Sequence, residues 1–262
     1  MRPIVALLTD FGTRDHYAGV MKGVVLSLCP DATLVDVTHE LPVHDITAAA
    51  YHLAATYKYF PPGTIFVTVV DPGVGSARRG VAVEAGDWKF VAPDNGVLTL
   101  VVRETAVKTA VELTERRYAR PTISRTFEGR DRFAPAAAWL AKGTAMTALG
   151  RPAHDLVQLD LPVLEETRES IAGAVVRVDR FGNAVSNIDR KTFEKLASGR
   201  SVAIIAGGKP VERIVATYAE IGEGEVCALF GSTDHLEIAS RNVSAAELRG
   251  LAFGSPVSVR RG

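Results

Sequence analysis

The chain has 262 residues, of which 47% are hydrophobic and 23% charged, and its 30 basic and 30 acidic side chains cancel at pH 7. These proportions are typical of a soluble globular protein with a sizeable core, and they exclude a disordered or fibrous chain. A balanced charge without long runs of one sign argues against a dedicated surface for nucleic acid or anionic membranes.

The cysteines and the first residues bear on the compartment. Cys29 and Cys227 are the only two cysteines and are far apart in sequence. This spacing favours buried free thiols over a disulfide framework or a metal site. The apolar run before Asp10 is too short for a signal-peptide core or a membrane span. Both features favour a cytoplasmic protein.

The first part of the chain alternates strand-like apolar runs with segments of helical spacing. Such alternation predicts an α/β domain with a mostly parallel sheet that helices cover. Asp45 is a plausible N-cap for the second helix. We expect strands at 3–10, 33–39 and 63–71, a hairpin or two short strands at 80–86 and 89–96, and helices at 16–30 and 45–60. The Ala-rich segment 129–143 is expected to be helical after Pro135.

The pattern changes near residues 159–167. Short segments rich in valine and isoleucine follow, separated by Gly, Asn and Asp, and no convincing helix is longer than 244–251. This pattern predicts an antiparallel β-barrel or sandwich. We therefore expect an α/β N-terminal domain over 1–160 and an all-β, barrel-like C-terminal domain over 168–262.

Polar residues follow the best predicted strands. In open parallel sheets, ligands bind beyond the carboxyl ends of the strands. Asp10, His39 with Glu40, and Asp71 lie at such ends, and residues 94–95 are further candidates. Acids at several strand ends favour a ligand with hydroxyls, amines or a cation over bare phosphate.

The stretch TVVDPGVGSARRG, residues 68–80, combines an acid, a glycine-rich turn and two arginines. It lacks the spacing of a P-loop and of a dinucleotide-binding turn, so phosphate binding is disfavoured. A structural turn and half of a catalytic site both stay open, with Arg79 expected as a surface charge. No pair of histidines has zinc-site spacing, and no Ser-His-Asp arrangement is evident.

Seven longer motifs occur in order along nearly the whole chain. They are LTDFGTRDHYAGVMKG, VDVTHELPVHDI, FPPGTIFVTVVDPGVGSARR, VAPDNGVLT, TFEGRDRFAPAAA, VDRFGNAVSNI and HLEIASRN. In this combination the chain resembles the S-adenosyl-L-methionine hydroxide adenosyltransferases, or SAM hydrolases, relatives of the fluorinase and chlorinase. The resemblance implies an α/β plus β-barrel architecture and a homotrimer with sites between the N-terminal domain of one subunit and the C-terminal domain of its neighbour.

The reaction that the resemblance implies is attack of water on the 5′ carbon of S-adenosyl-L-methionine, which releases adenosine and L-methionine. The substrate is a sulfonium cation, and its leaving group is a neutral thioether. The enzyme needs a water held in line with the breaking C–S bond and relieved of a proton. No metal or cofactor is implied.

The resemblance also assigns roles in the N-terminal domain, position by position. Asp10 matches the residue that binds the ribose hydroxyls. Asp15, with Tyr17 nearby, matches the methionine end, where an acid suits the substrate ammonium. Asp71 and Arg78 match the Asp and Arg that hold the attacking water.

The C-terminal domain supplies further contacts by the same resemblance. Asp179, Phe181 and Asn183 match contacts to ribose and adenine, although the segment alone would be read as a hairpin turn. An asparagine amide offers both a donor and an acceptor to adenine. The segment that closes over methionine and adenine contains Ser232, Glu237, Arg241 and Val243, the last two acting through backbone atoms.

One motif departs from the family pattern. The hydrolases have T-F-H-G-R-D, whereas this chain has TFEGRD, with Glu128 at the histidine position. In one interpretation Glu128 completes the catalytic set with Asp71 and Arg78 and takes up the proton of the water. In the other, the acids pair with Arg78 and Arg130, and the site binds the nucleoside without efficient turnover.

Other activities fit the motifs less well. The fluorinating branch has Tyr and Thr at the positions of Asp71 and Val74, and Tyr-Ser at Glu128-Gly129. A carboxylate at position 71 repels a halide. A methyltransferase is disfavoured because the family presents the 5′ carbon to the nucleophile. A non-catalytic binder of adenosine or S-adenosyl-L-methionine remains the alternative.

Overall fold

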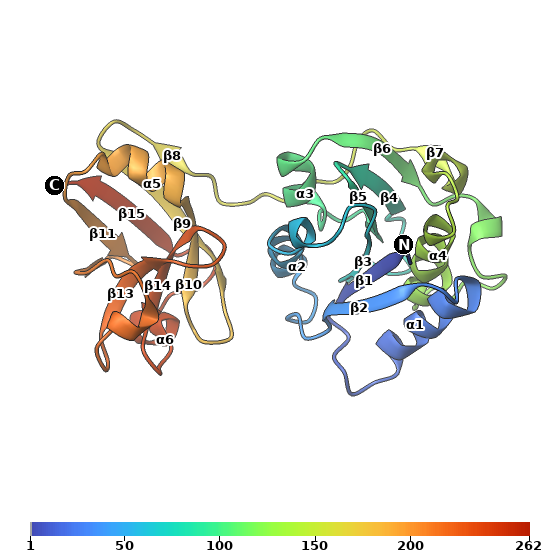
Figure 1. Cartoon of the computed structure of the whole chain (residues 1–262), viewed down its shortest axis with the longest axis horizontal. Helices are drawn as coiled ribbons and strands as arrows, with labels where there is room; N and C mark the ends of the chain where they lie inside the picture. The colour runs from blue at the N-terminus through green and yellow to red at the C-terminus, as the bar shows by residue number, and fades with distance from the viewer. Residues whose placement is uncertain (1) are drawn as a thin grey trace. The chain divides into compact units, whose positions relative to one another are not determined.

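The computed structural model describes residues 2–262, which form two compact units. The first ends at Leu159, and the second extends from Asp160 to Gly262 (Figure 1). Each unit has its own sheet and its own hydrophobic core. No helix within residues 2–262 is long and apolar enough to cross a membrane.

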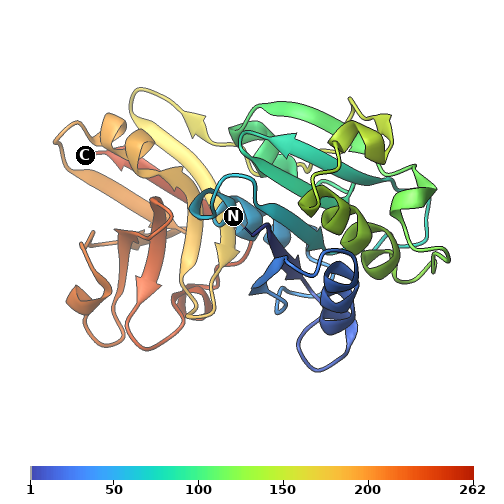
Figure 2. The same ribbon diagram turned by 45° about the vertical axis from the view of Figure 1, so that its right-hand side comes forward.

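The first unit contains a seven-stranded sheet in the order β2-β1-β3-β5-β4-β6-β7 (Figure 2). Strands β2, β1, β3 and β5 run parallel, whereas β4, β6 and β7 are joined by antiparallel pairs. The α/β prediction is confirmed, and β4 and β5 form the expected hairpin. The strands are β1 Ile4–Thr9, β2 Thr33–Thr38, β3 Ile65–Val69, β4 Gly80–Ala85, β5 Trp88–Pro93, β6 Val107–Glu112 and β7 Arg151–Pro152.

Helices cover both faces of this sheet. Side chains alternate along β1, so Val5 and Leu7 pack with α1 and α4, whereas Ala6 and Leu8 pack with α2 and α3 (Figure 1). Asp45 caps α2 as predicted, because its carboxylate accepts the N–H of Ala48 at 2.8 Å. The helices are α1 Tyr17–Leu28, α2 Ile46–Ala54, α3 Thr99–Glu104 and α4 Ala134–Ala141, with 3₁₀ turns at Tyr57–Tyr59, Arg116–Tyr118 and Met146–Leu149 and a π-helical turn at Gly129–Phe133.

The second unit is an antiparallel sheet of eight strands in the order β12-β11-β15-β9-β10-β14-β13, with β8 on β9. Backbone bonds of 2.9 Å from Val215 to Ala228 and from Ala228 to Arg213 join the segment after β12 to β13. The sheet is therefore a nearly closed barrel, and the all-β prediction is confirmed. The strands are β8 Glu165–Glu166, β9 Ser170–Val178, β10 Ala184–Asp189, β11 Val202–Ala206, β12 Lys209–Val211, β13 Val226–Phe230, β14 His235–Ser240 and β15 Pro256–Arg261.

The sequence analysis missed one helix of this unit. Helix α5, Arg190–Ala197, was not predicted, and of the predicted helix at 244–251 only α6, Ala245–Arg249, is helical. Asp189 caps α5 through the N–H of Thr192. The buried side chains of α5, Phe193 and Leu196, have helical spacing, which is a helical signal that the prediction overlooked.

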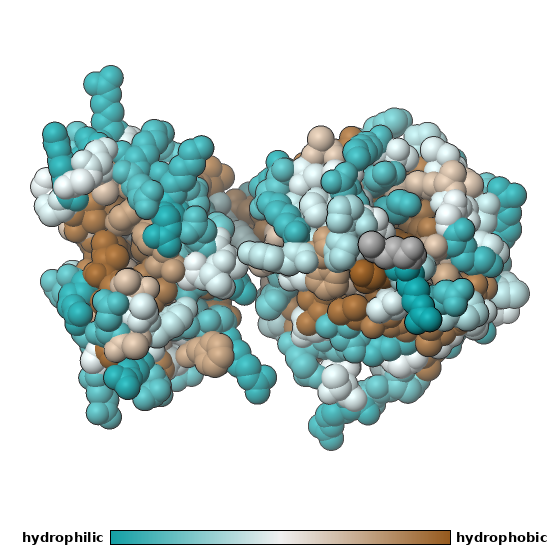
Figure 3. Space-filling model, in the orientation of Figure 1, coloured by the Kyte–Doolittle hydropathy of each residue, from teal (hydrophilic) through white to brown (hydrophobic). Residues whose placement is uncertain are grey.

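The surfaces of both units are mostly polar. In Figure 3, hydrophilic side chains cover most of the visible face, and hydrophobic ones form separate patches. The most exposed large apolar side chains are Tyr59, Phe181 and Val163. Scattered exposure of this kind is ordinary. The thiols of Cys29 and Cys227 are buried and unpaired, as predicted.

Candidate active site

A pocket of about 270 Å³ lies at the carboxyl ends of β1 and β3. The parallel register pairs Thr9 with Val69, so Asp10 and Asp71 follow the two strands at the same edge of the sheet. The TFEGRD segment contributes the opposite wall. The lining residues are Asp10, Phe11, Tyr17, Val43, His44, Val69, Asp71, Val74, Thr126, Phe127, Glu128 and Gly129.

Arg78 joins two carboxylates of this pocket. Its Nε donates to Oδ1 of Asp71 at 2.8 Å, and its Nη2 binds Oδ2 of the same carboxylate. Its Nη1 lies 2.8 Å from Oε2 of Glu128. The three side chains are 5%, 10% and 12% exposed for Asp71, Arg78 and Glu128, respectively. The structure therefore gathers the three predicted catalytic residues into one nearly buried cluster.

Two glycines shape the loop that leads from Asp71 to Arg78. The carbonyl of Asp71 accepts the N–H of Val74, and Gly73 accepts the N–H of Ser76. Gly75 has a φ of +79°, and a Cβ atom there would lie 2.4 Å from the carbonyl oxygen of Arg125. This close approach seats the loop against the segment that leads into Glu128. The glycines thus explain how two distant motifs meet.

Charge and burial compete at Asp71. Burial raises the pKa of the Asp71 carboxyl, and the charge of Glu128 raises it further, although the hydrogen bonds from Arg78 oppose both effects. The residues that line the pocket include three acids, Asp10, Asp71 and Glu128, and neither lysine nor arginine. Such a site favours a cationic ligand and a group that gives up a proton.

Glu128 immediately precedes the π-helical turn Gly129–Phe133, which continues into α4. Asp131 in this turn is fully buried and accepts hydrogen bonds from the Ser124 N–H and from Arg130. Burial would raise the pKa of Asp131, but these bonds outweigh it and lower the pKa. Asp131 thereby fixes the turn that presents Glu128. Turns of this type are frequent at functional sites.

The second arginine beside Glu128 is Arg132, not Arg130 as the binder interpretation assumed. Arg130 forms its ion pair with Asp131. The Nε atom of Arg132 lies 3.6 Å from Oε1 of Glu128. Glu128 therefore has a guanidinium near each of its two oxygens.

Asp10 and an aromatic cluster line the mouth of the pocket. Oδ2 of Asp10 accepts the backbone N–H of His44 at 2.9 Å, which orients the carboxylate. Tyr17 packs edge-on against Phe127 with ring centroids 5.0 Å apart, and Phe11 lies 5.7 Å from Tyr17. Aromatic faces beside acids suit a sulfonium or ammonium cation.

Other residues that the sequence analysis singled out do not line the pocket. Asp15 is exposed and is not among the residues that line the pocket. His39 is buried, with Nδ1 2.8 Å from Oγ1 of Thr9. Glu40 accepts a hydrogen bond from Thr13. The Asn95 amide donates to the carbonyl of Val70. These contacts fix the loops around the pocket.

Arg79 is not the free surface charge that the sequence predicted. Its Nε donates to Oδ2 of Asp94 at 2.9 Å, and its Nη1 donates to Asp155 at 2.7 Å. Asp94, which is buried, also accepts the N–H of Val157. Adjacent arginines thus have different roles: Arg78 bridges two carboxylates of the pocket, and Arg79 fastens the end of the first unit.

In the second unit, Asp179 organises the turn between β9 and β10. Its Oδ1 accepts the N–H groups of Phe181 and Asn183, each at 2.9 Å, and its Oδ2 accepts the Asn183 side-chain amide at 3.0 Å. The segment is therefore the hairpin turn that its sequence suggests. The turn leaves Phe181 79% exposed, with its ring free to stack on a flat ligand.

Glu237 on β14 is buried beside a tyrosine. It is 4% exposed, and its Oε2 accepts a hydrogen bond from the hydroxyl of Tyr218 at 2.7 Å. Burial raises the pKa of Glu237, and the charge of Asp179 adds to this effect. Burial also raises the pKa of Tyr218, and its contact with Glu237 raises that pKa further.

The other three C-terminal candidates are exposed. Ser232 lies in the turn between β13 and β14, and Arg241 and Val243 follow β14. Arg241 forms an isolated β-bridge with Glu223, so its backbone is held although its side chain is exposed.

The sequence analysis overlooked three residues of these clusters. Arg132 had a weak signal, since it is four residues after Glu128 and of opposite charge. Phe127 lies within the TFEGRD motif, but the sequence analysis assigned it no role. Tyr218 had no usable signal, because only the barrel fold brings it to Glu237. Residues 2–262 contain no group of three or more His, Cys, Asp or Glu side chains placed to hold a metal ion.

Comparisons with known proteins cover both units. Residues 5–150 match the SAM hydroxide adenosyltransferase N-terminal domain, and residues 173–258 match the C-terminal domain of the same name. An (R)-S-adenosyl-L-methionine hydrolase of Thermus thermophilus is 39% identical over 98% of this chain and 99% of its own length. One from Salinispora tropica is 36% identical over 99% and 98%, respectively.

A more distant relative and a solved structure also match nearly the whole chain. A fluorinase of Nocardia brasiliensis is 30% identical over 100% of this chain and 98% of its own. The crystal structure of an uncharacterized conserved protein from Thermotoga maritima superposes with a TM-score of 0.91 at 34% identity, covering 98% of this chain and 100% of that one.

Proposed function

The chain belongs to the S-adenosyl-L-methionine hydroxide adenosyltransferase family, and on this premise we propose that it hydrolyses S-adenosyl-L-methionine to adenosine and L-methionine. Water attacks the 5′ carbon of the ribose and forms the new C–O bond. The C–S bond breaks, and its electron pair stays on sulfur as the neutral thioether of methionine. The proton of the water passes to a carboxylate of the pocket.

The observation that carries this proposal is the contact of Arg78 with both Asp71 and Glu128. Arg78 occupies both oxygens of Asp71 but only Oε2 of Glu128. Oε1 of Glu128 is therefore the oxygen better placed to accept the proton, and Asp71 fixes Arg78 and accepts a second hydrogen bond from the water. A water held by two acceptors is aligned before attack, which lowers the entropic cost.

Of the substrate contacts proposed in the first unit, Asp10 and Tyr17 line the same pocket. Asp10 binds the ribose hydroxyls through Oδ1, since its Oδ2 accepts the N–H of His44. Tyr17, with Asp15 from the exposed segment before α1, receives the methionine end. The aromatic side chains beside Tyr17 favour a cation without adding a fixed charge.

The second unit is proposed to complete the substrate site. Phe181 stacks on adenine and Asn183 reads its edge, while Asp179 holds their turn in shape. The remaining proposed contacts to methionine and adenine are Ser232, Glu237, Arg241 and Val243.

We propose a homotrimer in which each site combines the first unit of one subunit with the second unit of its neighbour. The support is that the proposed catalytic and adenine-binding residues belong to different compact units. A cytoplasmic location is part of the proposal, and the two reduced, buried thiols support it.

Halide transfer is a poorer fit to the pocket. Asp71 and Glu128 put two carboxylates against one bridging guanidinium. A halide entering the pocket would meet the carboxylates of Asp71 and Glu128 where it needs hydrogen-bond donors. Water, which can donate hydrogen bonds to carboxylates, suits the cluster.

The function is tested by incubating the purified protein with S-adenosyl-L-methionine and measuring adenosine by mass spectrometry. Glu128→Gln should lower kcat by about 100-fold or more, because the amide cannot take up the proton. Glu115→Gln, at an exposed glutamate, is the matched control and should match the wild type. Unchanged activity in Glu128→Gln would remove the base role. A wild type that retains the ligand without forming adenosine would favour the binder.

A further inference from the structure

Glu128 is flanked by two cations that arise from different parts of the first unit. Arg78 comes from the loop after β3 and approaches Oε2 at 2.8 Å. Arg132 comes from the π-helical turn and lies 3.6 Å from Oε1. With Asp71, the four side chains carry two positive and two negative charges and balance. Without Arg132, the nearly buried group would carry one excess negative charge, which is unfavourable in a low-dielectric site.

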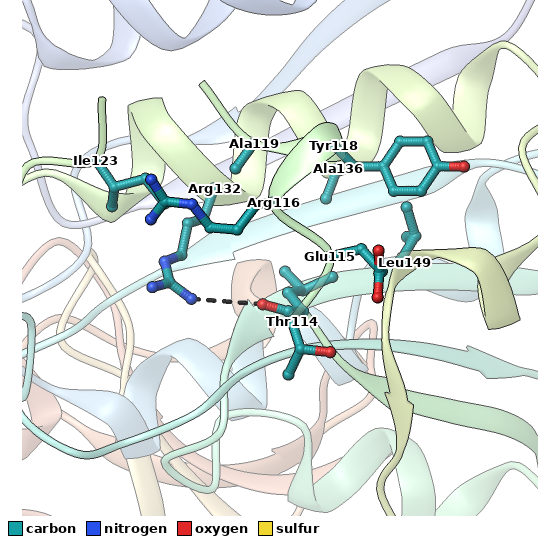
Figure 4. Close-up of a pocket in the computed structure, with 10 residues that line it drawn as sticks. Thr114, Glu115, Arg116, Tyr118, Ala119, Ile123, Arg132, Ala136 and Leu149 are labelled. Atoms are coloured by element: carbon teal, nitrogen blue, oxygen red, sulfur yellow. Dashed lines mark hydrogen bonds between the residues drawn. The ribbon is translucent and has the colours of Figure 1, made fainter. Parts of the chain in front are cut away.

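The position of Arg132 is fixed at its far end. Its Nη1 donates to the carbonyl of Leu113, just beyond β6, at 3.4 Å, a bond drawn in Figure 4. The Arg132 side chain lines a separate pocket with Thr114, Arg116 and Tyr118 and is absent from the lining of the Asp71 pocket. Arg132 therefore approaches Glu128 without belonging to the substrate pocket.

One N–H group of Arg132 remains unused. The Nε atom is buried and has no hydrogen-bond partner among residues 2–262. It is nevertheless 3.6 Å from the carboxylate oxygen that Arg78 leaves open. A small movement of Glu128 would convert this ion pair into a hydrogen bond, and contacts of this kind often shorten only in the substrate complex.

We propose that Arg132 is a positioning residue for the hydrolysis, holding the Glu128 carboxylate in the orientation in which it receives the proton of the attacking water. The inference rests on the proposed function. Without Arg132, Arg78 would still hold Oε2 of Glu128, but Oε1 would lose its nearby cation and the carboxylate could turn about the Arg78 contact. The reaction needs the water aligned with the breaking C–S bond, so a loss of orientation at Glu128 lowers kcat.

The test compares kcat and KM of Arg132→Met with those of the wild type. We expect kcat to fall about 10- to 100-fold with KM nearly unchanged, because Arg132 is outside the substrate pocket. Arg132→Lys should recover much of kcat through its charge. Arg116→Met, a change in the same separate pocket, should have no effect and is the matched control. Thermal melting checks that each variant folds.

A double variant separates positioning from general destabilisation. In a Glu128→Gln background, adding Arg132→Met should lower kcat no further, since the carboxylate that Arg132 holds is gone. Additive losses, a loss confined to KM, or an Arg132→Met enzyme equal to the wild type would overturn the inference while leaving the function intact. A wild type that forms no adenosine would instead remove the function itself, and the inference with it.

Discussion

The contact of Asp71 with Arg78 is the tightest part of the site. Both oxygens of Asp71 bind the guanidinium, and the carboxylate is 5% exposed. Asp71→Asn keeps the shape but removes the charge that fixes Arg78 and attracts the sulfonium. We expect kcat to fall by about 100-fold or more, measured as adenosine released. Asp155→Asn, which also loses an arginine partner but at the surface, should keep wild-type activity. Equal losses in both variants would contradict the role of Asp71.

The raised pKa of Glu237 predicts how the stability of the fold depends on pH. Burial raises its pKa, so the folded state favours the protonated form. The stabilisation of the fold by the protonated carboxyl is complete below pH 4.5, the pKa of Glu237 in the unfolded chain. It is lost as the pH rises through the higher pKa of the folded state. Glu237→Gln removes the charge and keeps an oxygen for Tyr218. The variant should be more stable than the wild type at pH 8, by on the order of 1 kcal/mol.

Thermal or urea unfolding at pH 4 and pH 8 measures this difference. The advantage of Glu237→Gln should vanish at pH 4. Glu223→Gln, at an exposed position in the same unit, should show no such change with pH. A Glu237→Gln variant that is less stable than the wild type at pH 8 would show that the ionised carboxylate stabilises the fold.

Sequence patterns alone predicted some of the site residues and missed others. Asp10 and Asp71 could be placed because parallel strands end at one edge of a sheet. Glu128 was found only through its motif, since nothing in its local pattern places it beside Arg78. Arg132 was missed because its neighbours Arg130 and Asp131 are also charged, and only the π-helical turn decides which side chain faces Glu128.

The loop between β3 and β4 depends on one glycine. Gly75 combines a left-handed φ with a close approach to the carbonyl of Arg125, whereas Gly63 has a similar φ but nothing within 4 Å. Gly63→Ala should cost about 1 kcal/mol of unfolding free energy from backbone strain alone. Gly75→Ala should cost about 1–3 kcal/mol more and lower kcat, because the loop must move away from the Glu128 segment.

Urea unfolding and kcat of the two variants provide the comparison. Equal destabilisation, with kcat unchanged in both, would show that the loop does not set the distance between Arg78 and Glu128. Among the elements themselves, the strands and α2 could be predicted from apolar period and cap. Helix α5 was missed although its buried side chains, Phe193 and Leu196, have helical spacing after the Asp189 cap.

At the scale of the whole molecule, the change from alternating to strand-only pattern predicted two fold types in one chain. The α/β sheet and the nearly closed barrel confirm both. The antiparallel half of the first sheet could not be foreseen in full, because β6 is partly exposed and polar and β7 has only two residues. How subunits associate depends on surfaces that carry no periodic signal.

The proposed trimer predicts complementation between inactive variants. Asp71→Asn damages the first unit, and Phe181→Ala, at a side chain that is 79% exposed, damages the second without disturbing the core. In a trimer that contains both variants, one of the three sites between neighbours, or about a third of the sites, would be intact. Co-expressed variants with two different tags, purified in tandem, should regain activity to that extent. No recovery would mean that each site is built from a single chain.

The proposed function depends above all on attack of water at the 5′ carbon of S-adenosyl-L-methionine. Turnover in oxygen-18 water, with mass spectrometry of both products, shows which product receives the oxygen atom of the water. We expect adenosine that carries one oxygen-18 atom and unlabelled L-methionine, both dependent on Glu128. Unlabelled adenosine, or no adenosine above a heat-killed control while the ligand stays bound, would contradict water attack.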